Sequence, residues 1–306
     1  MLQRDGFIDE IYKALEYDKD IYFLSADFGA AALDELRLTY KENFIHCGIS
    51  EQNMIDVATG LALLGKKVFC YAMAPFLSLR ALEQIKTGPG IMSLPITLIS
   101  VGVGIGYADS GPTHYVTEDF ACMRSIVGLN IFTAADTTSA RLLAKNIINN
   151  PKFTYVRLDR HYLPEITVDA DKSSYRIIGE MESSDKNQKK IALISHGKML
   201  HTCIDAVKEN PSIFFAIDLI NSKPFPNELI LELADFKNII VVDEQTPCGA
   251  LGTAVFEAFS HFNLFPKIIN ITLPEKYFFE NIGREGILNK NGMTVENILK
   301  QSKRFN

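Results

Sequence analysis

The sequence has no surplus of basic residues. Its 31 Lys and Arg residues are outnumbered by 37 Asp and Glu residues, which gives a formal net charge of −6 and a pI near 5.6. Nucleic acids and anionic membranes attract proteins through clustered positive charge, so the overall charge indicates neither partner. A local basic pocket for a phosphate group is still compatible with this composition. We therefore expect small molecules or proteins as partners, with no nucleic acid and no membrane.

Cysteine is scarce and scattered. The five cysteines, at positions 47, 70, 122, 203 and 248, are an odd number and include no CxxC pair. That spacing indicates neither a disulfide framework nor a zinc site, and we predict no metal ligands in this chain. Reduced thiols are typical of a cytoplasmic protein.

Long apolar runs, internal repeats and low-complexity tracts are missing too. No hydrophobic stretch approaches the roughly 20 residues of a membrane span. Residues 1–20 have the charged amphipathic pattern of a helix and not that of a signal peptide. With 47% hydrophobic and 22% charged residues, a chain of 306 residues has the composition of a globular protein long enough for two domains. We predict a cytoplasmic location.

What the sequence does have is a regular alternation of strand-like and helix-like segments. The first series has strands at 21–25, 68–72, 96–101, 130–133 and 153–157, and helices at 5–17, 50–64, 76–86, 118–126 and 137–149. The second has strands at 191–195, 212–218, 238–243 and 268–271, and helices at 200–208, at 227–233, near 249 and after 294. A polar stretch with one short strand candidate separates the two series. This pattern predicts an α/β protein with two doubly wound, mostly parallel domains, 1–165 and 190–306, joined by a linker at 166–189.

One of the predicted helices begins with an ionisable side chain. Apolar residues recur at helical spacing from Met54 to Ala62, with Ser50 ahead of them as an N-cap and Gly65 behind them as a C-terminal stop. Glu51 therefore lies in the first turn. Its position alone favours a carboxylate that complements the helix dipole, and a functional role needs support from its neighbours.

That support comes from segments that follow predicted strands. In open parallel sheets, ligands bind outside the carboxyl ends of the strands. The glycine-rich segment GVGIGYADSGPTH follows one such end and places His114 ahead of a helix, and Phe76 follows the preceding strand. Each signal is weak when taken alone. A lone histidine is more often structural, and an aromatic side chain can simply pack in the core. A GxGxG sequence without a helix directly after it seldom marks a nucleotide site. Their coincidence with Glu51 predicts a site at this edge.

Several segments together resemble a known family. GISEQNMIDVATGLALLGKKVF, FLSLRALEQI, GIGYADSGPTHYVTEDFACMRSI, NIFTAADTTSA and YVRLDRHYLP occur in the order and at the spacing of the pyrimidine-binding half of transketolases, and VVDEQTPCGALGTAV resembles their C-terminal domain. Deoxyxylulose-phosphate synthases are similar but more distant. The beta subunits of pyruvate dehydrogenase decarboxylases share the fold and the glutamate, but they are not expected to carry the GPTH loop.

The resemblance implies thiamine diphosphate and Mg²⁺ as cofactors. Glu51 matches the glutamate whose carboxyl group bonds to a ring nitrogen of the aminopyrimidine and drives its shift to the imino tautomer. Phe76 matches the aromatic residue that packs on the pyrimidine face. Met73 and Leu79 match other positions of the cofactor pocket.

The resemblance also implies a set of substrate-binding residues. His114 matches the histidine that contacts the oxygens of the ketose donor, where it can donate or accept a proton. Arg160 matches the arginine that binds the sugar phosphate, a role that suits its planar donor fork. Ser110 stands where an aspartate that reads a substrate hydroxyl is usual, and Asp109 lies one residue earlier; we include both in the substrate site.

Two features depart from ordinary transketolases. The positions usually held by a phosphate-contacting serine and histidine carry Ala31 and Gly102. We therefore expect a ketose, a phosphate or a modified sugar, whose tail is held less conventionally than in ordinary transketolases. The GDG sequence, through which the amino-terminal half of transketolases binds magnesium and the cofactor's diphosphate, does not occur. The resemblance therefore implies the C-terminal (beta) subunit of a split transketolase, completed in an α2β2 heterotetramer by an N-terminal subunit that carries GDG.

Three functions are open at this point. The first is the transfer of a two-carbon ketol unit from a ketose to an aldose. The second is half of another thiamine enzyme, such as a deoxyxylulose-phosphate synthase or an oxo-acid decarboxylase, which would release carbon dioxide from a 2-oxo acid. The third is a non-catalytic interaction subunit. The coincidence of Glu51, Phe76 and His114 favours catalysis.

Overall fold

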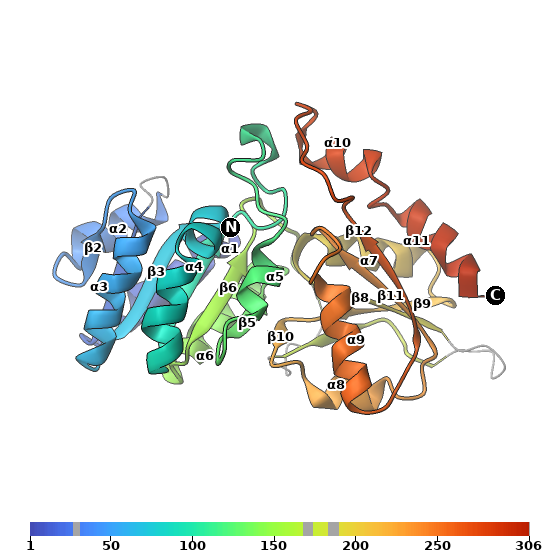
Figure 1. Cartoon of the computed structure of the whole chain (residues 1–306), viewed down its shortest axis with the longest axis horizontal. Helices are drawn as coiled ribbons and strands as arrows, with labels where there is room; N and C mark the ends of the chain where they lie inside the picture. The colour runs from blue at the N-terminus through green and yellow to red at the C-terminus, as the bar shows by residue number, and fades with distance from the viewer. Residues whose placement is uncertain (27–30, 168–173, 183–189, 306) are drawn as a thin grey trace.

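The computed structural model describes residues 1–26, 31–167, 174–182 and 190–305. These residues form two α/β units that lie side by side, with the N-terminal residues in one and the C-terminal helices in the other (Figure 1). The predicted class, an α/β protein with two mostly parallel sheets, is confirmed.

The first unit contains a seven-stranded sheet. In order across the sheet, its strands are β10 (Asn221–Lys223), β5 (Asn130–Thr133), β6 (Thr154–Leu158), β4 (Ile96–Val101), β3 (Lys67–Met73), β1 (Ile21–Ser25) and β2 (Phe44–His46). All neighbours pair in parallel except β10, which is antiparallel to β5. The carboxyl ends of the parallel strands therefore meet at one edge, where ligand-binding loops are expected.

Helices cover both faces of this sheet. On one face lie α1 (Gln3–Ala14), α2 (Ala32–Thr39) and α6 (Thr137–Asn149), and on the other lie α3 (Glu51–Leu63), α4 (Leu82–Ile85) and α5 (Asp119–Arg124). Successive side chains of a strand point to opposite faces. Along β3, Val68 and Cys70 accordingly join one hydrophobic core, whereas Phe69 and Tyr71 join the other. Burial on both faces explains why these strands read as nearly continuous apolar runs.

The second unit contains a five-stranded sheet. Its order is β12 (Lys267–Thr272), β11 (Asn238–Asp243), β8 (Ile191–Ser195), β9 (Phe214–Asp218) and β7 (Arg176–Ile178), and only the β7–β9 pair is antiparallel. The helices are α7 (Gly197–Glu209), α8 (Asn227–Glu232), α9 (Leu251–His261), α10 (Gly283–Lys290) and α11 (Val295–Ser302). The range predicted as a linker thus contributes β7 to this sheet.

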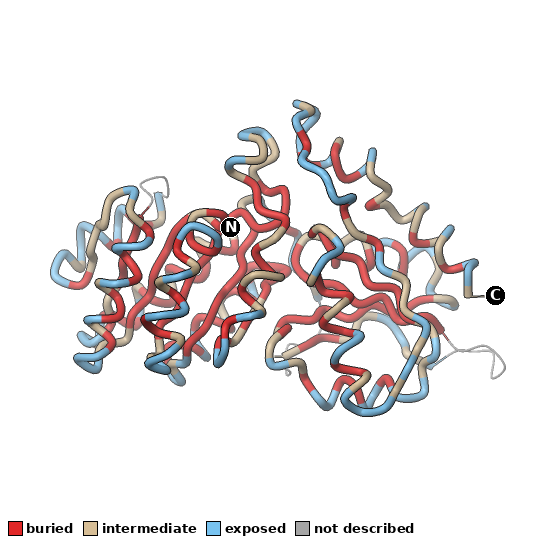
Figure 2. Tube along the Cα trace, in the orientation of Figure 1, coloured by how far each residue is buried: buried red, intermediate tan, exposed pale blue. Residues whose placement is uncertain are grey.

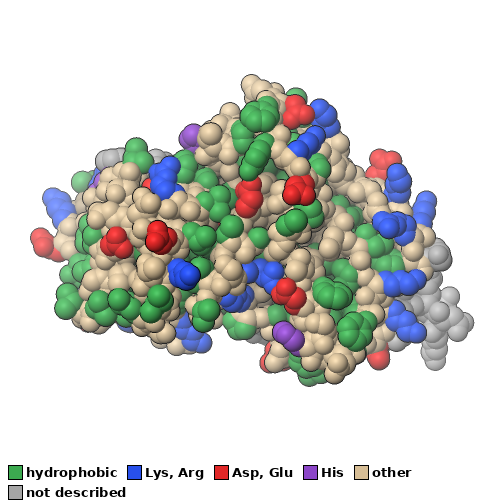
Figure 3. All heavy atoms as spheres, viewed as in Figure 1, with side chains coloured by type: hydrophobic (Ala, Val, Ile, Leu, Met, Phe, Trp, Pro, Cys, Tyr) green, Lys and Arg blue, Asp and Glu red, His purple; other side chains and the backbone are tan. Residues whose placement is uncertain are grey.

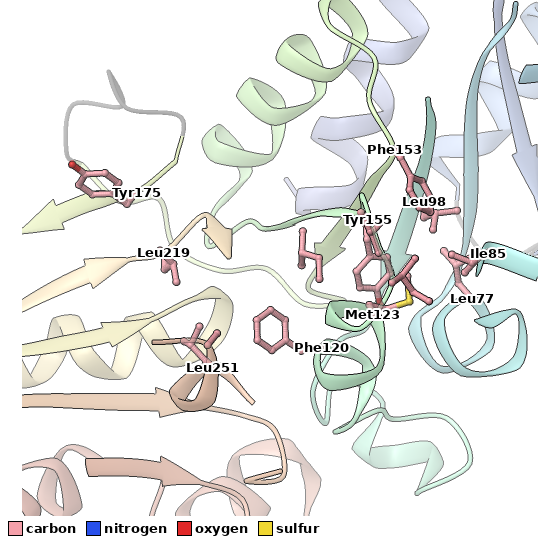
Figure 4. Close-up of a cluster of buried hydrophobic side chains, with 14 of the residues drawn as sticks. Leu77, Ile85, Leu98, Phe120, Met123, Phe153, Tyr155, Tyr175, Leu219 and Leu251 are labelled. Atoms are coloured by element: carbon pink, nitrogen blue, oxygen red, sulfur yellow. The ribbon is translucent and has the colours of Figure 1, made fainter. Parts of the chain in front are cut away.

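The two units share a buried contact. Phe120 and Met123 of α5 belong to the same hydrophobic cluster as Leu219 and Leu251 of the second unit (Figure 4). Buried segments run through both sheets and meet between them (Figure 2). No helix within the described ranges is long and apolar enough to cross a membrane.

Buried ion pairs also cross this contact. Arg284 pairs across it with Asp159 (2.7 Å) and Arg176 with Asp136 (2.9 Å), and each arginine also pairs within the second unit, with Glu244 (2.5 Å) and Asp218 (2.7 Å) respectively. Arg157 pairs with Asp119 (2.8 Å) inside the first unit and lies 3.0 Å from His196 Nε2 of the second. Removing one member of such a pair leaves an uncompensated buried charge, which is strongly destabilising. The relative placement of the two units is therefore fixed by specific charges as well as by apolar packing.

Candidate active site

Most predicted site residues lie at or after the ends of β3 and β4, whereas Glu51 begins α3 after β2 and Arg160 follows β6. β3 and β4 are parallel neighbours, so their carboxyl ends lie side by side. After β3 the chain enters a π-helical turn, η1 (Phe76–Arg80), and after β4 it forms the glycine-rich loop. The segment predicted as helical over 76–86 is helical, but it is not one regular α-helix: η1 is followed by α4 and by a second π-helical turn, η2 (Lys86–Gly90). Such turns are frequent at functional sites.

Glu51 is the first residue of α3 and is only 2% exposed. Ser50 is the N-cap, as predicted, although its side chain makes no capping hydrogen bond. The helix ends at Leu63, and Gly65, the predicted C-terminal stop, follows the C-cap Leu64 with a φ of +80°. There the Gly65 N–H donates to the Ala62 carbonyl (3.0 Å) in a Schellman motif. The helix thus holds a carboxylate in a buried position, where a polar group requires a partner.

That partner is Arg80, the last residue of η1. Its Nη1 donates to Glu51 Oε2 at 2.7 Å, and its guanidinium carbon lies 4.1 Å from the centroid of the Phe76 ring. The Phe76 ring in turn makes an edge-to-face contact with His114, with centroids 5.5 Å apart. The structure therefore links three predicted residues in one chain of contacts: Arg80 joins Glu51 to Phe76, and the Phe76 ring contacts His114.

His114 is half-buried and is oriented by its own loop. Its Nδ1 lies 2.8 Å from Thr113 Oγ1. The loop is closed at its base by an antiparallel bridge, in which the Val116 N–H donates to the Gly104 carbonyl at 2.9 Å. The histidine is thus presented by a closed loop on the Phe76 side of the site.

The two other predicted cofactor-pocket residues lie on the same segment. Met73 is the last residue of β3 and is half-buried. Leu79 lies in η1 and is 40% exposed. Neither belongs to the chain of contacts from Glu51 to His114, so a role in the pocket stays a prediction for both.

Two predicted substrate residues form a second group. Arg160 Nη1 lies 2.6 Å from Asp109 Oδ1, and its guanidinium carbon lies 4.3 Å from the centroid of the Tyr107 ring. The hydrogen bond from Arg160 is the main reason why the pKa of Asp109 is held below its usual value. Ser110, at the end of η3 (Ala108–Ser110), is exposed beside this pair.

The departure at Gly102 has a physical reason. Gly102 has a φ of +83°, and a Cβ built on it would lie 2.0 Å from Cε2 of Tyr107. No side chain fits there while the Tyr107 ring keeps its place. The histidine that is usual at this position is therefore incompatible with the Tyr107 ring on which Arg160 rests. Ala31, the other departure, is exposed at the N-cap of α2.

Arg80 and Tyr107 had not been assigned a role from the sequence. A signal for Arg80 was available, because it is the charged residue one helical turn after Phe76. Tyr107 offered only its place between glycines. Among the described residues, no group of three or more His, Cys, Asp or Glu side chains is arranged to hold a metal ion.

Comparison with protein families decides the assignment. A model described as transketolase, pyrimidine binding domain, matches residues 2–165, and a model described as transketolase, C-terminal domain, matches residues 179–298. The chain belongs to the transketolase family. Membership of this family implies dependence on thiamine diphosphate.

Several relatives of this chain are named as subunits or sections of transketolases. One subunit of the apulose-4-phosphate transketolase of Phocaeicola vulgatus is 28% identical over 99% of this chain and 96% of its own length. A putative transketolase C-terminal section of Methanocaldococcus jannaschii is 26% identical over 97% and 94%. A 6-deoxy-6-sulfo-D-fructose transketolase subunit of a Clostridium strain is 26% identical over 83% and 79%.

Solved structures show the same fold. A split gene transketolase, described as an inactive beta4 tetramer, superposes with a TM-score of 0.86 at 24% identity and covers 99% of this chain and 98% of its own. The transketolase of Pichia stipitis gives 0.79 at 17% identity, over 99% of this chain and 45% of its own. Together with this fold, the family models and the relatives of subunit length show that this transketolase chain is a C-terminal half of the split type, the beta subunit of a transketolase-type transferase.

Proposed function

We propose that this transketolase subunit holds the aminopyrimidine of thiamine diphosphate between Glu51 and Phe76. The observation that carries the proposal is the buried carboxylate of Glu51 beside an aromatic ring, at the edge of the sheet where parallel strands end. The guanidinium of Arg80 shows that a flat group can donate an N–H to Glu51 and pack on the Phe76 ring at the same time. Glu51 and Phe76 therefore fit the flat aminopyrimidine ring of the cofactor.

Each residue of the first group then has a role that follows from its chemistry. The bound cofactor supplies the nucleophilic carbon that attacks the ketose. Glu51 holds a proton at the ring nitrogen of the pyrimidine, and the Phe76 ring fixes the plane of the cofactor. His114 faces the substrate from the loop and exchanges a proton with a ketose oxygen as the carbon–carbon bond breaks or forms.

The second group, Arg160 with Asp109 and Ser110, would bind the far end of the sugar. The guanidinium of Arg160 suits an anionic tail, but it is already paired with Asp109. An anionic tail, whether a phosphate or another acidic group, must therefore displace or share that carboxylate. Relatives whose names specify a phosphate or a sulfo group support an anionic tail.

We further propose that an N-terminal subunit completes the site. The Phocaeicola vulgatus relative is named as one subunit of its transketolase, which implies a second chain in that enzyme, and the GDG sequence is missing from this chain. The partner would bind Mg²⁺ and the diphosphate, and two copies of each chain related by a twofold axis would give an α2β2 heterotetramer. All five cysteines are free, which is compatible with a cytoplasmic enzyme.

Reconstitution tests this function. The chain is mixed with a GDG-bearing transketolase N-terminal subunit from the same genome, Mg²⁺ and thiamine diphosphate, and ketol transfer from a ketose to an aldose is followed. We expect transfer by the mixture and none by either chain alone. Full activity of this chain alone would contradict the two-subunit proposal. Release of carbon dioxide from a 2-oxo acid, without ketol transfer, would favour an oxo-acid decarboxylase or a deoxyxylulose-phosphate synthase.

A further inference from the structure

Arg80 already makes the two contacts that the proposed function assigns to the cofactor ring. Its guanidinium donates to Glu51 Oε2 at 2.7 Å and lies over the Phe76 ring with its central carbon 4.1 Å from the centroid. A planar ring that stacks on Phe76 and bonds to Glu51 would occupy the same space. The guanidinium and the aminopyrimidine are therefore competitors for one position.

The competition has an electrostatic basis. Glu51 is almost completely buried, and a carboxylate in that position is unfavourable without a donor. Arg80 supplies a planar cation with several N–H donors, which also interacts favourably with an aromatic face. Its own side chain is 40% exposed, so it can swing into solvent without a rearrangement of the fold. Arg80 can thus satisfy Glu51 and still be displaced.

We propose that Arg80 is a positioning residue that holds the Glu51 carboxylate in place of the cofactor ring and must withdraw before thiamine diphosphate binds. This inference rests on the proposed function, since it takes Glu51 and Phe76 as the pyrimidine site. The new element is that a side chain of the pocket, Arg80, competes with the aminopyrimidine ring for Glu51 and Phe76. The measured affinity for the cofactor is then the intrinsic affinity reduced by the strength of the Arg80 contacts.

A structural ion pair that persists beside the bound cofactor is the competing interpretation. In that case Arg80 would support the pocket, and its removal would weaken cofactor binding. The two interpretations therefore predict opposite signs for the change in affinity, which makes binding a more decisive measurement than turnover.

The experiment is a calorimetric titration of the reconstituted complex, this chain with its GDG-bearing N-terminal subunit, with thiamine diphosphate and Mg²⁺, for the wild type and for Arg80→Ala. One partly exposed ion pair and one cation–π contact together correspond to a tightening of roughly 5- to 10-fold in Kd. Arg37→Ala is a matched control, because Arg37 also pairs with a carboxylate at 2.7 Å and is 43% exposed, but lies on α2 away from the site. Arg80→Lys, which keeps the charge without the planar fork, should lie between the wild type and Arg80→Ala.

A second measurement needs no cofactor. Arg80→Ala leaves the buried Glu51 carboxylate without a cation, so the midpoint of thermal unfolding should fall, whereas Arg37→Ala should leave it nearly unchanged. An affinity of Arg80→Ala equal to or weaker than that of the wild type, including no measurable binding by either, would overturn the proposal. The reconstitution assay separates the two conclusions: ketol transfer without tighter binding by Arg80→Ala retains the transketolase function and rejects the role of Arg80.

Discussion

At the scale of a single residue, Glu51 allows two interpretations: it can stabilise the start of α3, or it can serve a binding site. As a first-turn carboxylate it complements the α3 dipole, and any exposed acid would do so equally well. Its burial distinguishes the two interpretations, because an acid that serves only the dipole has no reason to be removed from water. The carboxylate also has a defined partner, because Arg80 donates to it while lying over the Phe76 ring.

Replacement of Glu51 by glutamine tests its chemical role. Glu51→Gln keeps the shape of the side chain but removes the group that holds the proton, so turnover of the reconstituted enzyme should fall by about two orders of magnitude or more. Asp56→Asn, at an exposed position of the same helix, is the control and should retain activity. Circular dichroism would verify that both variants are folded. Near-normal turnover of Glu51→Gln would rule out the proposed role.

Replacement of Arg160 tests the assignment of the sugar tail. Arg160→Ala removes a contact far from the reacting carbons, so KM should rise more than kcat falls. Steady-state kinetics with a ketose that carries a phosphate or sulfonate group would measure both. Asp109→Asn is the informative companion, because it frees Arg160 from its ion pair and should lower KM for the same substrate. A loss confined to kcat for Arg160→Ala would show that Arg160 acts elsewhere in the reaction.

At the scale of an element, the glycine-rich loop owes its shape to close approaches. Gly102 lies against the Tyr107 ring, and Gly104 has a φ of +61°, with a Cβ built there lying only 2.7 Å from the Glu244 carboxyl group. The loop therefore packs on its own aromatic residue and on the second unit at the same time. A side chain at either glycine would move the segment that carries Asp109 and His114.

Gly102→Ala is the most direct test of this packing. The added methyl group would collide with Tyr107 and oppose the positive φ, so the ring should shift and Arg160 should lose its support. We expect KM for the sugar to rise severalfold and Tm to fall slightly. Gly128→Ala is a useful control, because Gly128 also has a positive φ of +74° but nothing lies within 4 Å of a Cβ there. Equal kinetic effects of the two substitutions would indicate backbone strain rather than displacement of Tyr107.

The elements that could be predicted from the sequence are those whose signals are local. β1, β4, β5, β8 and β11 have the predicted bounds, because strands buried on both faces form short apolar runs between turns. α2, β2, β10 and α10 were missed. β2 and β10 have three residues each and are held by strand partners far along the chain, which no local pattern reveals. The Glu51–Arg80 pair was missed for the same reason, since it depends on how η1 packs against α3.

At the scale of the whole molecule, the charges on the surface differ from those buried between the two units. On the face shown in Figure 3, acidic and basic side chains are interspersed with hydrophobic ones. The notable charges are instead buried at the contact between the two units. There, burial raises the pKa of Asp159, but the Arg284 guanidinium outweighs this effect and holds that pKa at about 2.

This pKa has a consequence for stability in acid. A carboxyl group whose pKa is lower in the folded state than its usual 3.8 stabilises the fold above that usual value and loses the contribution as the pH falls towards 2. The shift corresponds to about 2 kcal/mol. The difference in the free energy of unfolding between the wild type and Asp159→Asn should therefore shrink between pH 5 and about pH 2. Urea titrations at several pH values would measure it, with the exposed Asp205→Asn as the control; a constant difference would contradict the assignment.

The strand β10 gives the two units a further dependence on each other. It follows β9 of the second sheet in the chain, yet it pairs with β5 and forms the outer edge of the first sheet, with the Thr133 N–H donating to the Ile220 carbonyl at 2.9 Å. A fragment cut after residue 165 would lack this strand and present the unpaired edge of β5. Exposed strand edges are templates for intermolecular pairing. The first unit expressed by itself should consequently aggregate. The strand that covers its edge, β10, lies more than fifty residues after residue 165, where the match to the pyrimidine-binding domain ends.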